Sequence, residues 1–249
     1  MARPKSQKEL SGKNSALLTT LENRHIRRLL LEAPFTLMTE ARKIRDGGVD
    51  QHGTYRSPDP GQAARLAATA VAIEIELHLP LRVLDLAALH LGVDLTQTDQ
   101  GRRDQRWRIA LNARKNGRRV ETELVGKSAA LLSEYVDKFK PLGPHPGSAW
   151  LFPHRDKQDH RPEGHFSEAI SHQIQRLTGV DMNVHAFRCF AALLIVEENP
   201  HALDDIRSLL GHASFETAWR YYIRQNRLAA AVRTNERIEN ERRKLGRGR

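Results

Sequence analysis

Cysteine and long apolar runs are both scarce in this chain of 249 residues. The single cysteine, Cys189, excludes a disulfide framework and suits a reducing compartment. No stretch approaches the roughly 18 uninterrupted apolar residues of a membrane span, and the first residues lack the apolar core of a signal peptide. We therefore expect a cytoplasmic protein with no membrane partner.

Recognisable metal and nucleotide motifs are also missing. The chain has no cysteine pair, no cluster of carboxylates and no glycine loop of the kind that cradles phosphates. His154, His160 and His165 share one polar segment, where metal ligation is conceivable. Their irregular spacing among Arg and Lys residues favours a solvated loop instead. We expect no metal and no cofactor.

Acidic residues are outnumbered by basic ones. The chain has 40 Lys and Arg against 30 Asp and Glu, a net charge of +10 and a pI near 10.1. This excess favours a polyanionic partner, most simply nucleic acid. A basic surface that is merely solvated is the alternative.

Hydrophobic periodicity predicts a mainly α-helical chain with a small antiparallel β-hairpin, an α+β fold. Glycine and proline residues between positions 46 and 61 indicate a loop or linker. Pro80 is expected to end the helix predicted over residues 62–78. The predicted helices cover residues 16–44 with an interruption at Pro34, 62–78, a segment that begins at Leu81, 128–140 and 166–177.

The predicted hairpin joins two alternating segments, 106–112 and 119–125. Asn116 and Gly117 favour a type I′ turn, which places Lys115 at the tip. Eight basic residues and one acidic residue fall between positions 102 and 119. The tip is either simply solvated or a means of bringing an ammonium group to a phosphate.

Further charged and aromatic residues stand at regular spacing on predicted helices. Arg82 and Asp85 are three apart, which suits a salt bridge that orients a helix. His185 and Arg188 are also three apart, on one predicted helix face. His212 follows a helix end at Gly211, and the next helix carries Tyr221 and Tyr222.

These residue types together suit chemistry on a phosphodiester. Two guanidinium groups can grip the non-bridging oxygens of one phosphate through paired hydrogen bonds. A tyrosine, with a pKa of about 10, needs a nearby histidine and a positive field to act as a nucleophile at neutral pH. A lysine can protonate the leaving 5′ oxygen.

Four segments resemble the boxes of the catalytic domain of tyrosine recombinases, the phage-integrase and Xer-like family. L-P-L-R-V-L-D-L is similar to the first arginine box, and R-K-N-G-R-R-V-E-T-E-L to the hairpin lysine segment. H-A-F-R is similar to the H-x-x-R box, and L-L-G-H with a tyrosine nine residues later to the closing box. The resemblance covers roughly residues 57–224.

The resemblance implies a role for each residue. Tyr221, with Tyr222 as the alternative nucleophile, would form a 3′-phosphotyrosyl link without metal or ATP. Arg82 and Arg188 would clamp the phosphate. His212 would form a hydrogen bond with the phosphate, and Lys115 would be the general acid. His185 would help to transfer the tyrosine proton, and Asp85 would support the site from behind the reacting groups.

The resemblance also implies partners. The expected partner is double-stranded DNA, bound by a homotetramer in which each copy docks a C-terminal helix, here residues 228–238, on a neighbour. Accessory DNA-bending proteins and association with the nucleoid are further expectations. Two positions depart from the common pattern: Cys189 stands where many members have His, and His90 where Arg is common.

The predicted domain organisation is incomplete for this family. Residues 1–56 form a basic arm and a helical segment too short for a core-binding domain, 57–226 a catalytic domain, and 227–249 a docking helix with a basic tail. The chain is either a minimal catalytic module or the C-terminal part of a longer recombinase. Two other hypotheses are a non-catalytic, truncated DNA-binding relative and an all-α protein whose His and Arg side chains only satisfy its core.

Overall fold

The structure is a computed structural model that describes residues 12–49, 53–99, 105–115, 117–199, 234–240 and 242–243. The chain divides into two compact units. One unit, here called the body, is Leu17–Arg188, and the other combines Met1–Ala16 with Cys189–Arg249. All the contacts described below lie within the body.

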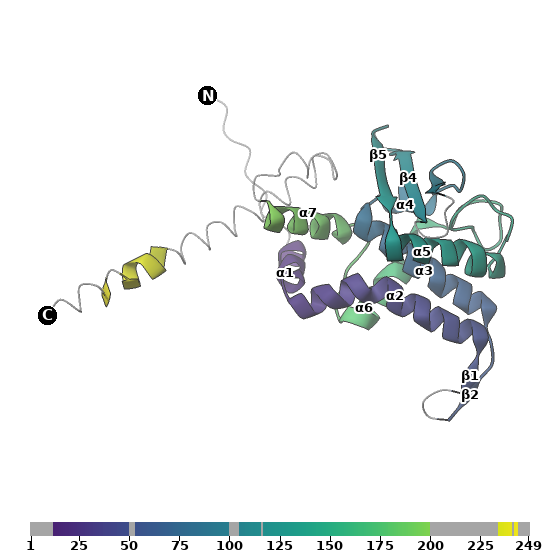
Figure 1. Ribbon diagram of the computed structural model, residues 1–249, viewed down its shortest axis with the longest axis horizontal. Helices are drawn as coiled ribbons and strands as arrows, with labels where there is room; N and C mark the ends of the chain where they lie inside the picture. The colour runs from purple at the N-terminus through teal and green to yellow at the C-terminus, as the bar shows by residue number, and fades with distance from the viewer. Residues whose placement is uncertain are drawn as a thin grey trace. The chain divides into compact units, whose positions relative to one another are not determined.

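Two helices, α2 (Arg24–Asp46) and α3 (Pro60–His78), lie side by side at the centre of the body (Figure 1). The predicted interruption at Pro34 is wrong, because α2 continues through this residue. Pro34 is itself buried with the apolar face of α2. Packing of that face against α3 outweighs the backbone hydrogen bond that proline cannot make.

Side-chain caps define where both helices begin. The Asn23 side chain accepts a hydrogen bond from the backbone N–H of His25, and Asp59 does the same for Gln62. Between the helices, the short strands β1 (Gly48–Val49) and β2 (Tyr55–Arg56) pair antiparallel. As predicted, α3 ends just before Pro80.

A three-stranded antiparallel sheet in the order β3-β4-β5 packs on helix α5 (Gly126–Glu134). Its strands are β3 (Leu95–Asp99), β4 (Arg106–Asn112) and β5 (Arg119–Leu124). Trp107 and Ile109 of β4 point inward, and the Trp107 indole N–H donates to the Ser133 hydroxyl at 2.8 Å. The predicted strands of the hairpin are confirmed, and β3 adds an edge that the sequence patterns did not predict.

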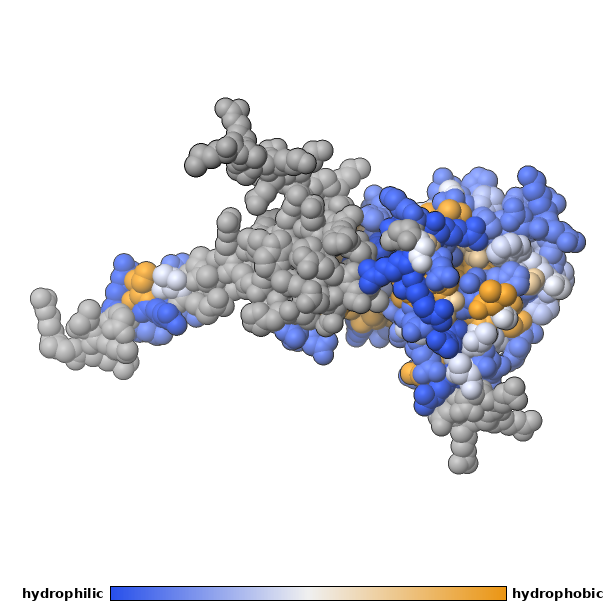
Figure 2. Space-filling view, turned by 90° about the horizontal axis from the view of Figure 1, so that it is seen from above, coloured by the Kyte–Doolittle hydropathy of each residue, from blue (hydrophilic) through white to orange (hydrophobic). Residues whose placement is uncertain are grey.

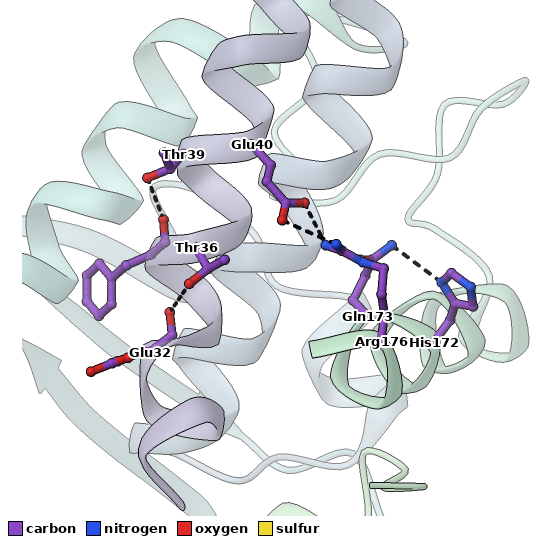
Figure 3. Close-up of polar contacts among 8 residues, drawn as sticks. Glu32, Thr36, Thr39, Glu40, His172, Gln173 and Arg176 are labelled. Atoms are coloured by element: carbon purple, nitrogen blue, oxygen red, sulfur yellow. Dashed lines mark hydrogen bonds and ion pairs between the residues drawn. The ribbon is translucent and has the colours of Figure 1, made fainter. Parts of the chain in front are cut away.

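The remaining elements of the body pack against α3. The chain continues from α5 as a π-helix (Tyr135–Phe139) and a 3₁₀ turn (Lys140–Leu142). Helix α6 (Glu163–Thr178) packs on both α2 and α3. Figure 3 shows one link between these helices, where Arg176 of α6 forms an ion pair with Glu40 of α2 at 2.6 Å.

Apolar side chains on the visible surface of the body form only small separate patches among hydrophilic ones (Figure 2).

The division between the two units falls within two helices, α1 (Gly12–Leu21) and α7 (Ala186–Glu198). Residues 234–240 and 242–243 are helical, and 234–238 fall within the predicted docking helix, 228–238. Among the described residues, no helix is both long enough and apolar enough to cross a membrane. The predicted fold class, mainly α with a small antiparallel sheet, is confirmed.

Candidate functional site

Arg82 stands at the junction between α3 and the short helix α4 (Val83–Ala87). It has an extended backbone, and its carbonyl accepts the first bond of α4, from the Leu86 N–H at 2.9 Å. The helix predicted to begin at Leu81 therefore begins two residues later and lasts little more than one turn. Leu81 is 4% exposed and anchors the chain directly before Arg82, whose side chain is half-buried.

Asp85 links α4 to the hairpin instead of pairing with Arg82. Its carboxylate, 2% exposed, accepts a hydrogen bond from the backbone N–H of Arg114 at 3.0 Å. No ion pair joins Arg82 and Asp85 within the described ranges, so the predicted salt bridge is wrong. Because Arg114 directly precedes Lys115, the buried carboxylate holds the loop that carries the lysine.

The loop between β4 and β5 is longer than the predicted two-residue turn. The Ala113 N–H donates to the Arg118 carbonyl at 2.7 Å, and the Gly117 N–H donates to the Ala113 carbonyl at 2.8 Å. Four residues, 114–117, therefore lie between the hydrogen-bonded positions Ala113 and Arg118. Gly117 has a φ of 65°, a left-handed backbone conformation that favours glycine. Lys115 is exposed in this loop, as expected for the hairpin tip.

His185 lies in the turn that leads into α7, one residue before the helix begins. The Asn183 side chain accepts from the Ala186 N–H at 3.1 Å and so fixes the start of the helix. Although the ring is partly exposed, partial desolvation lowers the pKa of His185, and the charges of Arg188 and Arg82 lower it further. The neutral imidazole is therefore favoured at pH 7.

Arg188 is the buried cation of the site, at 8% exposed. Its charge contributes to the lowered pKa of His185 and opposes the rise that burial causes in the pKa of Glu76 on α3, which stays well above its ordinary value. Glu76 was not among the residues predicted from sequence. The available signal was a pair of acidic residues, Glu74 and Glu76, in a helix that is otherwise apolar all round.

A cavity of about 650 Å³ brings four of the predicted residues together: Arg82, Asp85, Lys115 and His185. Arg82, Lys115 and His185 all line it, although 103 residues of sequence separate the first from the last. Asp85 and Arg114 lie beside them. The cavity is therefore lined by two positively charged side chains and one imidazole. They come from the residue before α4, the hairpin loop and the turn before α7.

Three predicted residues, His212, Tyr221 and Tyr222, lie outside the described residues. The histidines of the polar loop have local partners: the His154 ring accepts from the Asp156 N–H at 2.9 Å, and the His160 ring lies 3.1 Å from the Arg161 carbonyl. Across the described ranges, no group of three or more His, Cys, Asp or Glu residues is arranged to hold a metal ion.

The fold is similar to that of a solved recombinase. The match is to the crystal structure of XerH site-specific recombinase bound to difH substrate in a pre-cleavage complex. Sequence identity is 20% and the TM-score is 0.56, over 90% of this chain and 55% of that chain. The chain thus spans about half the length of that recombinase, and at this identity the likeness concerns the fold.

Sequence comparison identifies the family. No curated protein sequence matches the chain. The family model described as "Phage integrase family" matches residues 62–228, which include nearly all of α3, the three-stranded sheet and every predicted site residue. The resemblance to tyrosine recombinases that the four sequence boxes predicted is thereby confirmed. The chain belongs to the phage integrase family.

Proposed function

We propose that the chain is a site-specific DNA recombinase that cleaves and rejoins DNA strands through a 3′-phosphotyrosyl intermediate. The observation that carries the proposal is the cavity in which Arg82, Lys115 and His185 meet, with the buried Arg188 acting on the same histidine. Family membership and the DNA bound to the similar XerH structure add support.

The two arginines are the proposed phosphate clamp. In the pentacoordinate transition state negative charge accumulates on the non-bridging oxygens, and guanidinium donors fixed in advance stabilise it. Such a donor is typically worth about 3–4 kcal/mol in mutagenesis. Arg82 stands at a helix junction and Arg188 in the protein interior, so both are held before DNA arrives.

Tyr221 is the proposed nucleophile. Its hydroxyl oxygen attacks phosphorus, the bond from phosphorus to the 5′ oxygen breaks, and the 3′ phosphate remains on the tyrosine. Ionising a tyrosine at neutral pH costs about 4 kcal/mol, which a proton acceptor and nearby cations offset. His185 suits the acceptor role, because its lowered pKa keeps the ring neutral.

Lys115 is the proposed general acid, and His212 is proposed to donate a hydrogen bond to the phosphate. The lysine gives its proton to the departing 5′ oxygen, which leaves as a hydroxyl group. In the rejoining step a 5′ hydroxyl gives its proton to the lysine and attacks phosphorus, the bond from phosphorus to the Tyr221 oxygen breaks, and the tyrosine takes its proton back from His185. The bond energy is kept in the covalent link, so the cycle as proposed uses neither ATP nor a metal ion.

Assembly follows from the same proposal. Two duplexes require four active copies, and the helical residues 234–238 belong to the segment, 228–238, proposed to dock on a neighbouring copy. A DNA partner also fits the net charge of +10 and implies a location at the nucleoid. Accessory DNA-bending proteins are a further proposed partner.

The test is covalent trapping. The wild type and the Tyr221→Phe and Tyr222→Phe variants are incubated in EDTA with a pool of nicked suicide duplexes of randomised sequence. We expect an SDS-stable protein–DNA adduct that only Tyr221→Phe abolishes. If low-salt reactions across the pool give no adduct with wild type, the chain is instead the non-catalytic DNA-binding relative.

A further inference from the structure

The body has a second cavity, of about 440 Å³, which we call the α3–α6 cavity. It is lined by the N-terminal part of α3, by Lys140 and the turn after it, and by the chain that enters α6. It shares no lining residue with the cavity that holds Arg82. Ala68 is its last lining residue on α3, ten residues or about 15 Å of helix before His78, where α3 ends. The two cavities are therefore separate sites.

Basic side chains dominate the polar lining of the α3–α6 cavity. Three cationic residues have no carboxylate within ion-pair distance in the described part of the chain: Arg65, Lys140 and Arg161. Asp156 is the one acid among the described lining residues, and it is exposed and already paired with Arg155, whose Nε lies 3.2 Å from its Oδ1. The described residues therefore leave the positive charge of this cavity without a compensating anion.

Arg161 is fixed in the cavity by its own local contacts. Its backbone N–H donates to the Phe152 carbonyl at 2.8 Å, and its guanidinium carbon lies 4.9 Å from the centre of the Phe166 ring. Stacking on a ring leaves the N–H donors at the edge of a guanidinium open, and none of the described residues accepts from them. Burial lowers the pKa of Arg161, and the charge of Arg65 adds to this effect, while Tyr135 opposes it. Two guanidinium groups thus line one space with no anion between them.

Lys140 adds a third cation to the same lining. The residue is 5% exposed, and its ammonium donates to the carbonyls of Pro146 and Ser148. An ammonium has three donors, so one remains after these two bonds. Burying a cation is costly unless an anion lies close to it. A bound anion would therefore offset the cost of placing these charges together.

The walls of the cavity also indicate which anion fits. A phosphate group carries up to two negative charges at neutral pH and so matches several cations better than a carboxylate does. The rest of the lining is largely apolar, a composition typical of sites for small organic molecules, and the volume lies in the usual range for such sites. Its members include Ala64, Ala68, Phe152, Pro144, Pro153 and Pro162. The phosphates of a DNA backbone would gain nothing from these apolar contacts.

We propose that the α3–α6 cavity binds a small organic phosphate, whose phosphate group pairs with Arg161 and Arg65 and whose organic part packs on the apolar lining. The site is distinct from the proposed active site, and binding to it is independent of the cleavage chemistry.

The first turns of α6 line both cavities. Glu163 and Ser167 contribute to the cavity that holds Arg82, whereas Pro162 and His165 contribute to the α3–α6 cavity. A ligand of the α3–α6 cavity therefore contacts a helix that also lines the proposed active site.

The test is isothermal titration calorimetry of the full chain with four probes: 5′-AMP, phenyl phosphate, adenosine and inorganic phosphate. The first two carry both parts of the proposed ligand, whereas adenosine lacks the phosphate and inorganic phosphate lacks the organic part. We expect at least one of the two organic phosphates to bind with a Kd below about 1 mM. Adenosine and inorganic phosphate should bind at least about 10-fold more weakly.

Variants locate the binding. Arg161→Gln should weaken it by about 10- to 100-fold, the usual effect of removing hydrogen bonds to a charged group. Arg65→Gln should weaken it by about 3- to 10-fold, because Arg65 is exposed, and it carries the test if Arg161→Gln does not fold. Arg28→Gln is the matched control, since it removes an exposed arginine of α2 that lines neither cavity. Arg82→Gln shows whether the probe enters the other cavity instead. Both of these variants should keep the wild-type Kd within about twofold.

Absence of saturable binding by both organic phosphates would overturn the proposal, as would a loss in Arg28→Gln or Arg82→Gln equal to that in Arg161→Gln. If Arg161→Gln weakens binding of intact duplex and neither organic phosphate binds, the cavity is a contact for the DNA backbone and the proposal is wrong. These outcomes do not affect the trapped adduct of the wild type, so failure of this proposal and failure of the proposed function are distinguishable.

Discussion

The arginine region and the lysine loop of the candidate site are built in different ways. Arg188 is in the protein interior. Arg82 follows the end of α3, and the carboxyl of Glu76 accepts a hydrogen bond from the backbone N–H of Leu81, the residue before it. Lys115 is exposed on a four-residue loop, which Asp85 holds by one backbone hydrogen bond. The contrast suits the two tasks: a clamp benefits from charges fixed in advance, whereas a proton donor can approach the bond as it breaks.

The largest effect is expected in the arginine region. Arg188→Ala should slow adduct formation by about 100- to 1,000-fold, because a preorganised donor to the transition state is lost. Single-turnover rates on the nicked duplexes measure this. A rate within a few-fold of wild type, in a variant that urea denaturation shows to be folded, would remove Arg188 from the clamp.

The lysine loop should respond through the leaving group. Lys115→Ala is expected to slow cleavage by about 100-fold or more, the usual contribution of a general acid. A substrate with sulfur in place of the 5′ bridging oxygen should restore most of the rate, since a thiolate leaves without a proton. Lys127→Ala, an exposed lysine outside the cavity, is the control. A defect that persists with the sulfur substrate would contradict the acid role.

The link between the two regions should show an intermediate effect. Asp85→Ala leaves the Arg114 N–H without its acceptor and should cost about 1–3 kcal/mol in the free energy of unfolding. Asp85→Asn retains an oxygen for that bond and should lose less. Urea denaturation of both variants measures the difference. Equal losses would mean that the hydrogen bond to the loop does not account for the role of Asp85.

The smallest effect is expected away from both regions. The Arg176–Glu40 ion pair joins α6 to α2 on the surface, with side chains 41% and 34% exposed (Figure 3). Glu40→Gln should change the free energy of unfolding by about 0.2–1 kcal/mol and leave the cleavage rate unchanged. A clear loss of cleavage would show that the packing of α6 on α2 shapes the site, although neither the arginine region nor the lysine loop contacts this ion pair in the proposed mechanism.

Elements with strong periodicity were predictable from the sequence, and weakly patterned ones were not. Helix α3 and strands β4 and β5 were predicted closely because their apolar spacing is regular. Strand β3 is mostly polar and buries only Leu95 among its residues with described side chains, so its pattern carried little signal. Pro34 was misjudged because burial of the surrounding face against α3 overrides the local preference.

The site was predictable in its residues more than in its contacts. Arg82, Lys115 and His185 were predicted from motifs, and the structure brings them to one cavity. The partner of Asp85 could not be predicted, since its bond to Arg114 joins positions 29 residues apart. Glu76 was overlooked because two acids in an otherwise apolar helix leave the apolar spacing intact, and its hydrogen bond from the Leu81 N–H is formed only in the folded chain. The predictions for His212 and the tyrosines still stand as predictions.

The most direct test of the account is to identify the residue that becomes joined to DNA. Wild-type adduct from the nicked duplexes is treated with nuclease and then trypsin, which should release residues 221–224, Tyr-Tyr-Ile-Arg, as one peptide. We predict that fragmentation mass spectrometry finds the nucleotide remnant on Tyr221. A remnant on a residue other than the two tyrosines, or no DNA-linked peptide from a folded protein that binds the duplexes, would contradict the central claim.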